Sequence, residues 1–322
     1  MIRSATAIAF AALGMLALLH GTPARATLLK IWVSNAGADN NTCGDSSTPC
    51  RTFFQAVTNV TAGGEIGVLT PGDYGFLEIT KAVSITNDGT GEASIFAPPG
   101  ASQAGILIAA GNGDIVSLRG LIIDGLAGAQ YGIFIQRASA VHVQNCVVRN
   151  FEAQNGWGIV NASKSSTVLF VSDTLIYNNG SNPGTGGVQI QSFGVRANAV
   201  LDRVHLENNV IGLSVDGRAV GPSRALIRDS VVSGNATDGI LAITGNAPAF
   251  IVVEHTTTLY NAGVGIHADG PGGTILLNDN TVTLNGTGIS ATNSGQLISY
   301  GNNRNNNNIG PEGAPTGFYS QM

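Results

Sequence analysis

Short apolar segments separated by glycine and asparagine recur along most of this chain. A glycine followed by Ile, Val or Leu opens each repeat, at Gly105, Gly132, Gly158, Gly187, Gly212, Gly239, Gly265 and Gly288. Successive glycines of this set are 23 to 29 residues apart. The residue three positions after each glycine is also apolar, with Asn161 as the exception. This period of two predicts a β-strand at the start of every repeat.

Each repeat carries two further short apolar segments before the next glycine. In one repeat they are Val141–Val143 and Val147–Val148, and the second of them ends at Asn150. Three short strands per repeat predict one coil of a parallel β-solenoid, because helical repeats of this length would need amphipathic stretches of roughly 10–15 residues. The sequence contains neither such stretches nor the leucine spacing of leucine-rich repeats.

Stacked coils place equivalent side chains above one another at about 4.8 Å, the spacing of hydrogen-bonded strands. We expect the column Ile106, Ile133, Ile159 and Val188 to point inward and fill the core. The sequence thus predicts an all-β parallel solenoid of about nine or ten coils over residues 66–308.

Both ends of such a stack need covering, because unpaired strand edges invite association. Residues 27–65 are expected to form an N-terminal cap with a short amphipathic helix over about 49–61, in which Thr48 is the N-cap and Pro49 the first helical residue. We expect residues 309–322 to form a loose C-terminal tail.

Residues 1–26 predict a secretory signal peptide. Arg3 supplies the positive start, Ala5–Leu19 the apolar stretch and Ala24–Ala26 the small-residue cleavage site. A retained membrane anchor is the alternative, but Gly21–Pro23 interrupts a helix just before the site. We therefore expect a secreted or periplasmic protein without a transmembrane segment after cleavage.

Export also bears on the cysteines. Cys43 and Cys50 lie in a polar, turn-rich segment, and in an oxidising compartment we expect them to form a disulfide rather than two free thiols. Cys146 lies within an apolar strand pattern and is expected to be a buried, inert thiol.

Charged residues make up only 11% of the chain, and glycine contributes 44 of 322 residues. Loss of Arg3 and Arg25 from 15 basic residues would leave 13 against 20 acidic ones. This balance argues against a coiled coil and against nucleic acid as a partner. A solenoid needs few charges, because most of its residues are buried or lie in turns.

Several motifs resemble those of secreted bacterial right-handed parallel β-helix proteins. They include Ile31–Ser34, Cys50–Phe53, Gly63–Ile66, Pro71–Gly75, Ile79–Ile85, Ser117–Leu121 and Ser299–Asn303. The resemblance covers nearly the whole chain after the signal. It implies a right-handed parallel β-helix with the architecture of the pectate lyase and polygalacturonase superfamily, and it implies no particular activity.

The motifs of the superfamily's enzymes are not found in this sequence. Polygalacturonase-like hydrolases carry Asp-Asp, Gly-His-Gly and Arg-Ile-Lys, and none of the three occurs here. Pectate-lyase-like enzymes use calcium-binding carboxylates with a nearby base, and no matching motif stands out. We expect no organic cofactor and assign no metal ligand; calcium stays open, without a compact acidic cluster to support it.

The glycine register predicts which residues of the first strand point outward. Two residues after the glycine, early coils present Leu107, Phe134 and Val160, and later coils present Gln189, Ser214, Leu241 and His267. Four residues after the glycine, the outward residues include Gln136, Gln191, Asp216, Ile243 and Asp269. We expect all of these to face solvent. Phe134, Gln136, Gln189 and Gln191 are the candidate substrate-binding residues.

Asp216, Asp269 and His267 are the candidate catalytic residues. The two carboxylates lie two coils apart, about 9–10 Å by strand spacing, near the upper limit of roughly 9.5 Å for an inverting glycosidase pair. His267 could share the proton transfer. Alternatively, Asp216 and Asp269 are ordinary turn residues, because each precedes a glycine.

These features predict a monomer that presents an extended face to a polysaccharide or another cell-envelope glycan. A polysaccharide lyase or glycoside hydrolase on the same face is one alternative, and a structural or adhesive surface protein is another.

The roles of three arginines and of two aromatic residues stay open. Arg149, Arg203 and Arg228 either meet an anionic glycan or pair with neighbouring acids, and Phe151 and Trp157 either stack on sugars or fill a loop junction.

Overall fold

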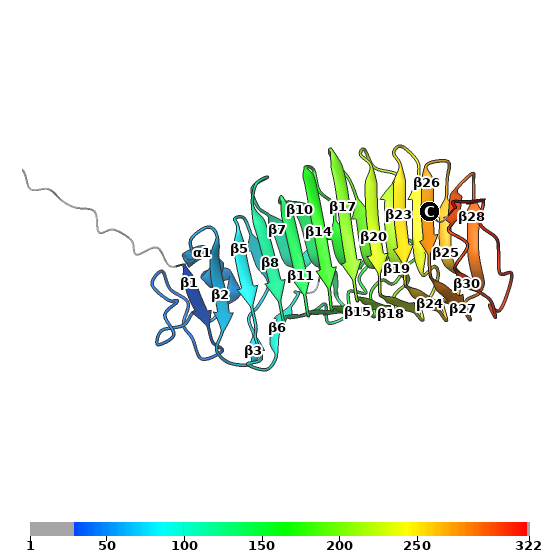
Figure 1. Ribbon diagram of the computed structural model, residues 1–322. Helices are drawn as coiled ribbons and strands as arrows, with labels where there is room; N and C mark the ends of the chain where they lie inside the picture. Colours follow the sequence, from blue (N-terminus) through cyan, green and yellow to red (C-terminus); the bar gives the residue numbers. More distant parts are fainter. Residues whose placement is uncertain (1–28, 99, 321–322) are drawn as a thin grey trace, which may run out of the picture.

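The computed structural model describes residues 29–98 and 100–320, and within them three parallel β-sheets run along the length of the molecule (Figure 1). Between the two ends of the solenoid each coil contributes one strand to each sheet, so an interior strand pairs with the equivalent strands of the coils before and after it. The all-β right-handed solenoid is confirmed, with about nine turns.

The first sheet contains the strands that open the repeats. It consists of β4 (Leu77–Ile79), β7 (Gly100–Ala109), β10 (Ala129–Arg137), β13 (Trp157–Asn161), β16 (Gly186–Gln191), β19 (Ile211–Gly217), β22 (Ile240–Thr244), β25 (Val264–Asp269) and β28 (Thr287–Thr292).

The second sheet lies at the front in Figure 1. It consists of β1 (Lys30–Val33), β2 (Gly64–Val68), β5 (Val83–Thr86), β8 (Ile115–Arg119), β11 (Ala140–Gln144), β14 (Ser166–Ser172), β17 (Arg196–Asp202), β20 (Ser223–Arg228), β23 (Ala249–Glu254), β26 (Gly273–Asn278), β29 (Gln296–Ser299) and β31 (Gly317–Phe318).

The third sheet has the shortest strands. It consists of β3 (Gly72–Asp73), β6 (Ala93–Phe96), β9 (Ile122–Asp124), β12 (Val147–Arg149), β15 (Leu175–Tyr177), β18 (His205–Glu207), β21 (Val231–Ser233), β24 (Thr257–Leu259), β27 (Thr281–Thr283) and β30 (Arg304–Asn305).

Aliphatic side chains stack in unbroken columns inside the coil. In the first sheet the pairing register aligns Leu77, Ile106, Ile133, Ile159, Val188, Leu213, Ile240, Ile266 and Ile289. Every one of these side chains is buried. The predicted inward column is therefore confirmed, and it extends over the whole sheet. Each column places apolar surface against the same kind of surface one strand spacing away, which is the main stabilising contribution.

A buried ladder of asparagines follows the third sheet. It consists of Asn179, Asn209, Asn235, Asn261 and Asn285, and Asn308 ends it. Asn235 is typical of the ladder: its Nδ2 donates to Asn261 Oδ1 (2.7 Å) and to the carbonyl of Leu206 (3.2 Å). Its Oδ1 accepts from the Asn209 backbone (2.9 Å). Each side chain thus satisfies buried backbone groups of its neighbours.

The residue before each ladder position has left-handed backbone. Asn150, at which the sequence pattern ends a strand, has φ of 63°, and Asn178 and Asn208 have φ of 57° and 54°. Asparagine tolerates this conformation better than most residues. At the first of these turns Phe151 takes the ladder position, and its N–H donates to Asn179 Oδ1 (3.2 Å).

The repeat glycines lie against this ladder. A Cβ on Gly212 would lie 2.5 Å from the carbonyl oxygen of Gly239 and 3.1 Å from Asn235 Nδ2. Gly239 and Gly265 meet the next coil in the same way. Any larger residue would push adjacent coils apart, so this close approach explains why glycine opens the repeats.

The N-terminal cap differs in detail from the prediction. The helix α1 is shorter than expected, Phe53–Asn59, and Thr52 rather than Thr48 is its N-cap, with Oγ1 accepting from Gln55 N (3.2 Å). Thr48 instead forms an antiparallel bridge with Asp45. The Cys43–Cys50 disulfide that closes this turn is confirmed, with 4.9 Å between the Cα atoms. The short loop holds the chain extended past residue 50, which delays the helix.

Both ends of the solenoid extend further than expected. β1 already pairs in parallel with β2, so coil hydrogen bonding begins within the segment assigned to the cap. In the segment expected to be a loose tail, β31 pairs with β29. The predicted signal peptide lies outside the described residues. Among the described residues, no helical segment combines the length and hydrophobicity that a membrane crossing needs.

We predict that Asn235→Ala lowers the free energy of unfolding by about 3 kcal/mol, because the Asn209 N–H and the Leu206 carbonyl each lose a buried partner. Urea denaturation followed by circular dichroism measures this change. Asn112→Ala, in an exposed loop, is the control and should stay within about 0.5 kcal/mol of the parent. Equal stability of the two variants would show that the ladder contributes nothing.

We also predict that Cys146 is unreactive in the folded protein. Its side chain is buried, and burial raises the pKa of the thiol to about 11. Because the thiolate is the reactive form, a thiol reagent at neutral pH should label the native chain negligibly and the unfolded chain at one site. Rapid labelling of the folded protein would contradict this.

Candidate functional site

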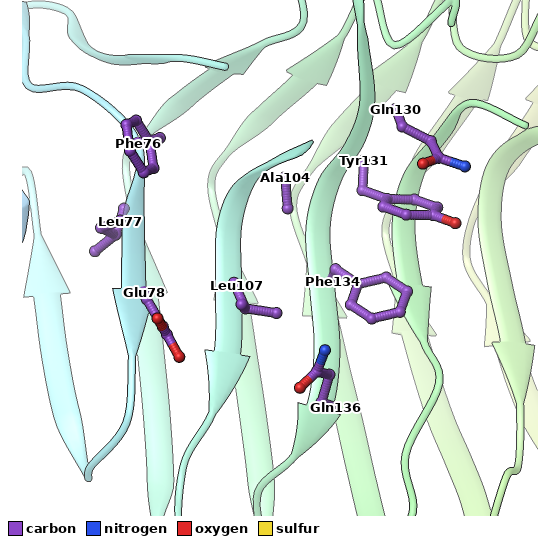
Figure 2. A pocket seen from close by; sticks show the side chains of 9 residues that line it. All are labelled: Phe76, Leu77, Glu78, Ala104, Leu107, Gln130, Tyr131, Phe134 and Gln136. Atoms are coloured by element: carbon purple, nitrogen blue, oxygen red, sulfur yellow. The ribbon is translucent and has the colours of Figure 1, made fainter. Parts of the chain in front are cut away.

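The outer face of the first sheet carries a cleft of about 520 Å³ near its N-terminal end. Figure 2 shows its lining, which comes from β4, β7 and β10 and the residues just before them: Phe76, Leu77, Glu78, Ala104, Leu107, Gln130, Tyr131, Phe134 and Gln136. The cleft therefore spans three neighbouring coils.

One wall of the cleft is aromatic. The rings of Tyr131 and Phe134 are 4.6 Å apart between centroids and tilted by 31°. Both pack against a small cluster of Trp157, Val160 and Ala162 on the next coil. Burial raises the pKa of the Tyr131 hydroxyl. Phe76, at the opposite end, leaves 51% of its surface exposed. The rings are thus held in place from behind while their other side borders the cleft.

Polar side chains reach into the same cleft from two strands. Glu78 on β4 pairs in register with Leu107, which pairs in turn with Phe134. Glu78 and Gln136 are both exposed, and Figure 2 shows them on either side of Leu107. A carboxylate and an amide thus flank an apolar floor, an arrangement typical of a site for a ligand with hydroxyl groups and an apolar ring face.

The predicted binding residues divide into two groups. Phe134 and Gln136 line the cleft. Gln189 lies two strands further along, because Phe134 pairs with Val160 and Val160 with Gln189. Gln191 donates from Nε2 to Asp216 Oδ2 (3.0 Å), so its amide is engaged with a carboxylate. The four residues share one face without forming one pocket.

The expectation that all outward residues face solvent is wrong for Val160, Ser214, Asp216 and Leu241, which are buried. They do point out from the sheet, but side chains from neighbouring positions cover them. Trp157 packs on Val160, and Arg218 lies against Asp216. The register fixed the direction of each side chain, while its exposure depends on neighbouring side chains, such as Trp157 within β13 and Arg218 in the loop after β19.

Asp216 is enclosed in a hydrogen-bond network. Arg218 Nη2 donates to its Oδ2 (2.7 Å), and the Arg218 backbone N–H donates to its Oδ1 (2.8 Å). The hydrogen bond to this carboxylate, and its charge, raise the pKa of Arg218. Asp216 and Asp269 are indeed two strands apart, with Ile243 between them in the register.

His267 lies at the centre of a chain of polar contacts. Its Nδ1 is 2.8 Å from Asp238 Oδ2, and its Nε2 is 2.9 Å from Thr292 Oγ1. Thr292 also donates to Asp269 Oδ1 (2.8 Å). The structure therefore links two predicted residues, His267 and Asp269, through Thr292.

Asp238 and Thr292 were missed as site residues. Asp238 precedes Gly239 and resembles an ordinary turn residue in sequence, and Thr292 carries no distinctive signal. Both meet His267 only because the coils stack. Among the described residues, no group of three or more His, Cys, Asp or Glu side chains could hold a metal ion.

The open questions on arginines and aromatics are also answered. Arg149 pairs with Asp124 (2.7 Å), Arg203 with Asp173 (2.7 Å) and Arg228 with Asp202 (3.0 Å). These cations are paired with acids of neighbouring coils. Phe151 and Trp157 are both buried and fill the junction between a loop and the coil.

Comparison with known proteins agrees with this architecture. The family model described as the right-handed β-helix region matches residues 104–309. The chain belongs to the right-handed β-helix family. This β-helix protein is similar in structure to the pectate lyase Pel9A, with a TM-score of 0.65 and 12% identity over 91% of this chain and 79% of that one.

A second solved structure similar to the β-helix protein is an alginate lyase from a Paenibacillus species, with a TM-score of 0.57 and 13% identity over 89% of this chain and 97% of that one. Identities this low establish a shared fold and leave the activity to be argued from the site. No curated protein sequence matches the chain significantly.

We predict that Arg218→Ala lowers the free energy of unfolding by about 2 kcal/mol, because the buried Asp216 carboxylate loses its charged partner while it keeps bonds to Gln191 and the backbone. The control is Arg224→Ala, which removes an exposed arginine on β20 that forms no ion pair among the described residues. Its free energy of unfolding should stay within about 0.5 kcal/mol of the parent. Urea denaturation compares the two. If Arg218→Ala is as stable as the control, the ion pair has no structural role.

Proposed function

We propose that the outer face of the first sheet binds an extended glycan, and that the cleft around Phe134 holds one of its sugar rings. The observation that carries the proposal is the pairing of a fixed aromatic wall with exposed polar groups in one cleft. A sugar ring offers an apolar C–H face to aromatic rings and hydroxyl groups to a carboxylate or an amide. The fold shared with a pectate lyase and an alginate lyase supports a glycan as the ligand.

The length of the sheet suits a polymer. Its nine strands repeat at about 4.8 Å, so the face continues for roughly 40 Å. Beyond the cleft it presents Gln189, which is half-buried, and then the polar chain around His267. A repeating ligand can contact several coils at once, which adds affinity without a deep pocket.

The charge of the cleft favours a neutral sugar. Glu78 is the charged residue of the lining, and no cation contributes to it. Arg137, next to Gln136, donates to the backbone carbonyls of Ala110 (2.7 Å) and Ala109 (3.3 Å). A uronate carboxylate in the cleft would lie near Glu78, and the lining itself supplies no cation to offset their repulsion, so we propose that the ring held there is uncharged.

Glycan cleavage is a second candidate function, favoured by the contacts of His267. His267 contacts Asp238 at Nδ1 and the Thr292 hydroxyl at Nε2, and that hydroxyl donates in turn to Asp269, so the histidine belongs to a chain of polar contacts suited to proton transfer. Asp269 would be the accompanying carboxylate. Asp216 would have to leave Arg218 before it could take part.

The binding proposal predicts that Phe134→Ala weakens binding of a neutral oligosaccharide about tenfold, since the stacking surface is lost. A glycan array of neutral and uronate oligosaccharides identifies the ligand, and isothermal titration calorimetry measures the affinity. Phe170→Ala, which removes an exposed aromatic ring from the second sheet, is the matched control and should bind as the parent does.

Three outcomes would decide between the candidates. Absence of any glycan ligand, together with self-association or cell adhesion, would favour a structural surface protein and refute glycan binding. Release of reducing ends or of unsaturated products, abolished by His267→Gln, would establish cleavage. Preference for uronates in the parent protein would contradict the assignment of a neutral sugar.

A further inference from the structure

Three consecutive loops between the first and second sheets form an unusual surface. They span residues 162–165, 192–195 and 218–222, and they lead into β14, β17 and β20. In Figure 1 these loops lie at the upper edge, where the three strands begin. The surface begins on the coil next to the aromatic cleft, since β13 pairs with β10, and its exposed apolar residues Phe193, Val195 and Val220 lie on the two coils after that.

The three loops stack directly on one another. The Phe193 N–H donates to the Ser163 carbonyl (3.0 Å), and the Val220 N–H donates to the Ser192 carbonyl (3.2 Å). Gly221 approaches the Gly194 carbonyl so closely that a side chain there would collide with it. Residues of neighbouring loops are therefore held next to each other by the backbone.

Large apolar side chains project from two of these loops. Phe193 is 47% exposed, Val195 67% and Val220 74%. Burial of apolar surface stabilises a fold, so three such residues at adjacent loop tips are better explained by a partner than by folding.

Cations surround these tips. Lys164, Arg196 and Arg224 are exposed, and none of them forms an ion pair within the described part of the chain. Arg218 is the fourth cation, and it pairs with the buried Asp216. The segments 162–166, 192–197 and 217–225 contain no Asp or Glu, although the whole chain has a net charge of −5.

At the corner between the second and third sheets, by contrast, arginines are paired with acids. There Arg119, Arg203 and Arg228 each pair with an aspartate at 3.2, 2.7 and 3.0 Å. Within the described residues Lys164, Arg196 and Arg224 have no such partners, so their charge is available to an outside ligand. Unpaired positive charge in an acidic protein selects a negatively charged partner.

We propose that this surface docks on an anionic lipid membrane. Apolar tips enter the boundary between headgroups and acyl chains, and the surrounding cations contact the phosphate groups. A soluble polyanion would satisfy Lys164, Arg196 and Arg224 but would leave the apolar tips in water. A lipid surface satisfies both, because negative charge there lies directly above an apolar phase.

Co-sedimentation with vesicles tests the proposal. The mature protein should bind vesicles of equal parts phosphatidylcholine and phosphatidylglycerol and should not bind vesicles of phosphatidylcholine alone. Rising salt should weaken binding, since exposed charges are screened. Replacing Lys164, Arg196 and Arg224 by glutamine one at a time should weaken binding about fivefold each.

The variant that distinguishes lipid from other anions is Phe193→Ser combined with Val195→Ser and Val220→Ser. It should lose binding to the anionic vesicles while it keeps its far-ultraviolet circular dichroism spectrum. Ile309→Ser, which removes a side chain that is 84% exposed in the C-terminal segment, is the matched control and should bind as the parent does.

Two results would overturn the proposal. One is binding to a soluble polyanion such as alginate in the absence of vesicle binding, which would assign the cations to a glycan. The other is vesicle binding that the triple serine variant retains, which would place the contact elsewhere. The triple serine variant leaves the lining of the cleft unchanged, so its failure to bind vesicles can be told apart from a loss of neutral-glycan binding, which is measured separately with Phe134→Ala.

Discussion

The close contact between stacked glycines and a buried asparagine ladder governs this structure. Each asparagine amide bonds a neighbouring asparagine and a strand carbonyl of the preceding coil, as Asn261 does with Asn285 (2.8 Å) and the Val232 carbonyl (3.1 Å). The repeat glycine beside it has no room for a side chain. From Asn179 onward these two requirements fix the turn at the same place in each coil, which keeps the aliphatic columns aligned.

A fixed interior leaves the exterior free to vary. Equivalent outward positions of the first sheet are occupied by Phe134, Gln189 and His267, although the coil beneath them hardly changes. The corner between the second and third sheets uses paired arginines, whereas the edge between the first and second sheets carries unpaired cations and apolar tips. The two sides of the same coil therefore differ in charge and in exposed apolar surface.

Solvent exposure and the hydrogen bonds or ion pairs already formed, rather than residue type, decide which outward side chains are available for chemistry. Asp216 and Asp269 occupy equivalent positions, two strands apart. Asp216 is buried under Arg218, while Asp269 accepts from Thr292 and Asn293 and stays partly exposed. Residues that look interchangeable in the repeat therefore differ in what they can do, because the loop after each strand has its own length and composition.

The sequence alone determined the solenoid, its inward columns, the glycine at the start of each coil and the Cys43–Cys50 pair. All of these follow from patterns that are local or strictly repeated, since each coil contacts only its neighbours in the stack. The tertiary structure decided the rest: the Thr52 cap, the burial of Asp216, and the meeting of Asp238, His267 and Thr292. The contacts of His267 join side chains 25 and 29 residues apart, whereas the Thr52 cap and the cover over Asp216 depend on the conformation of the adjoining loop. The conformations of these loops are set by contact with the coils on either side, so the repeat pattern does not predict them.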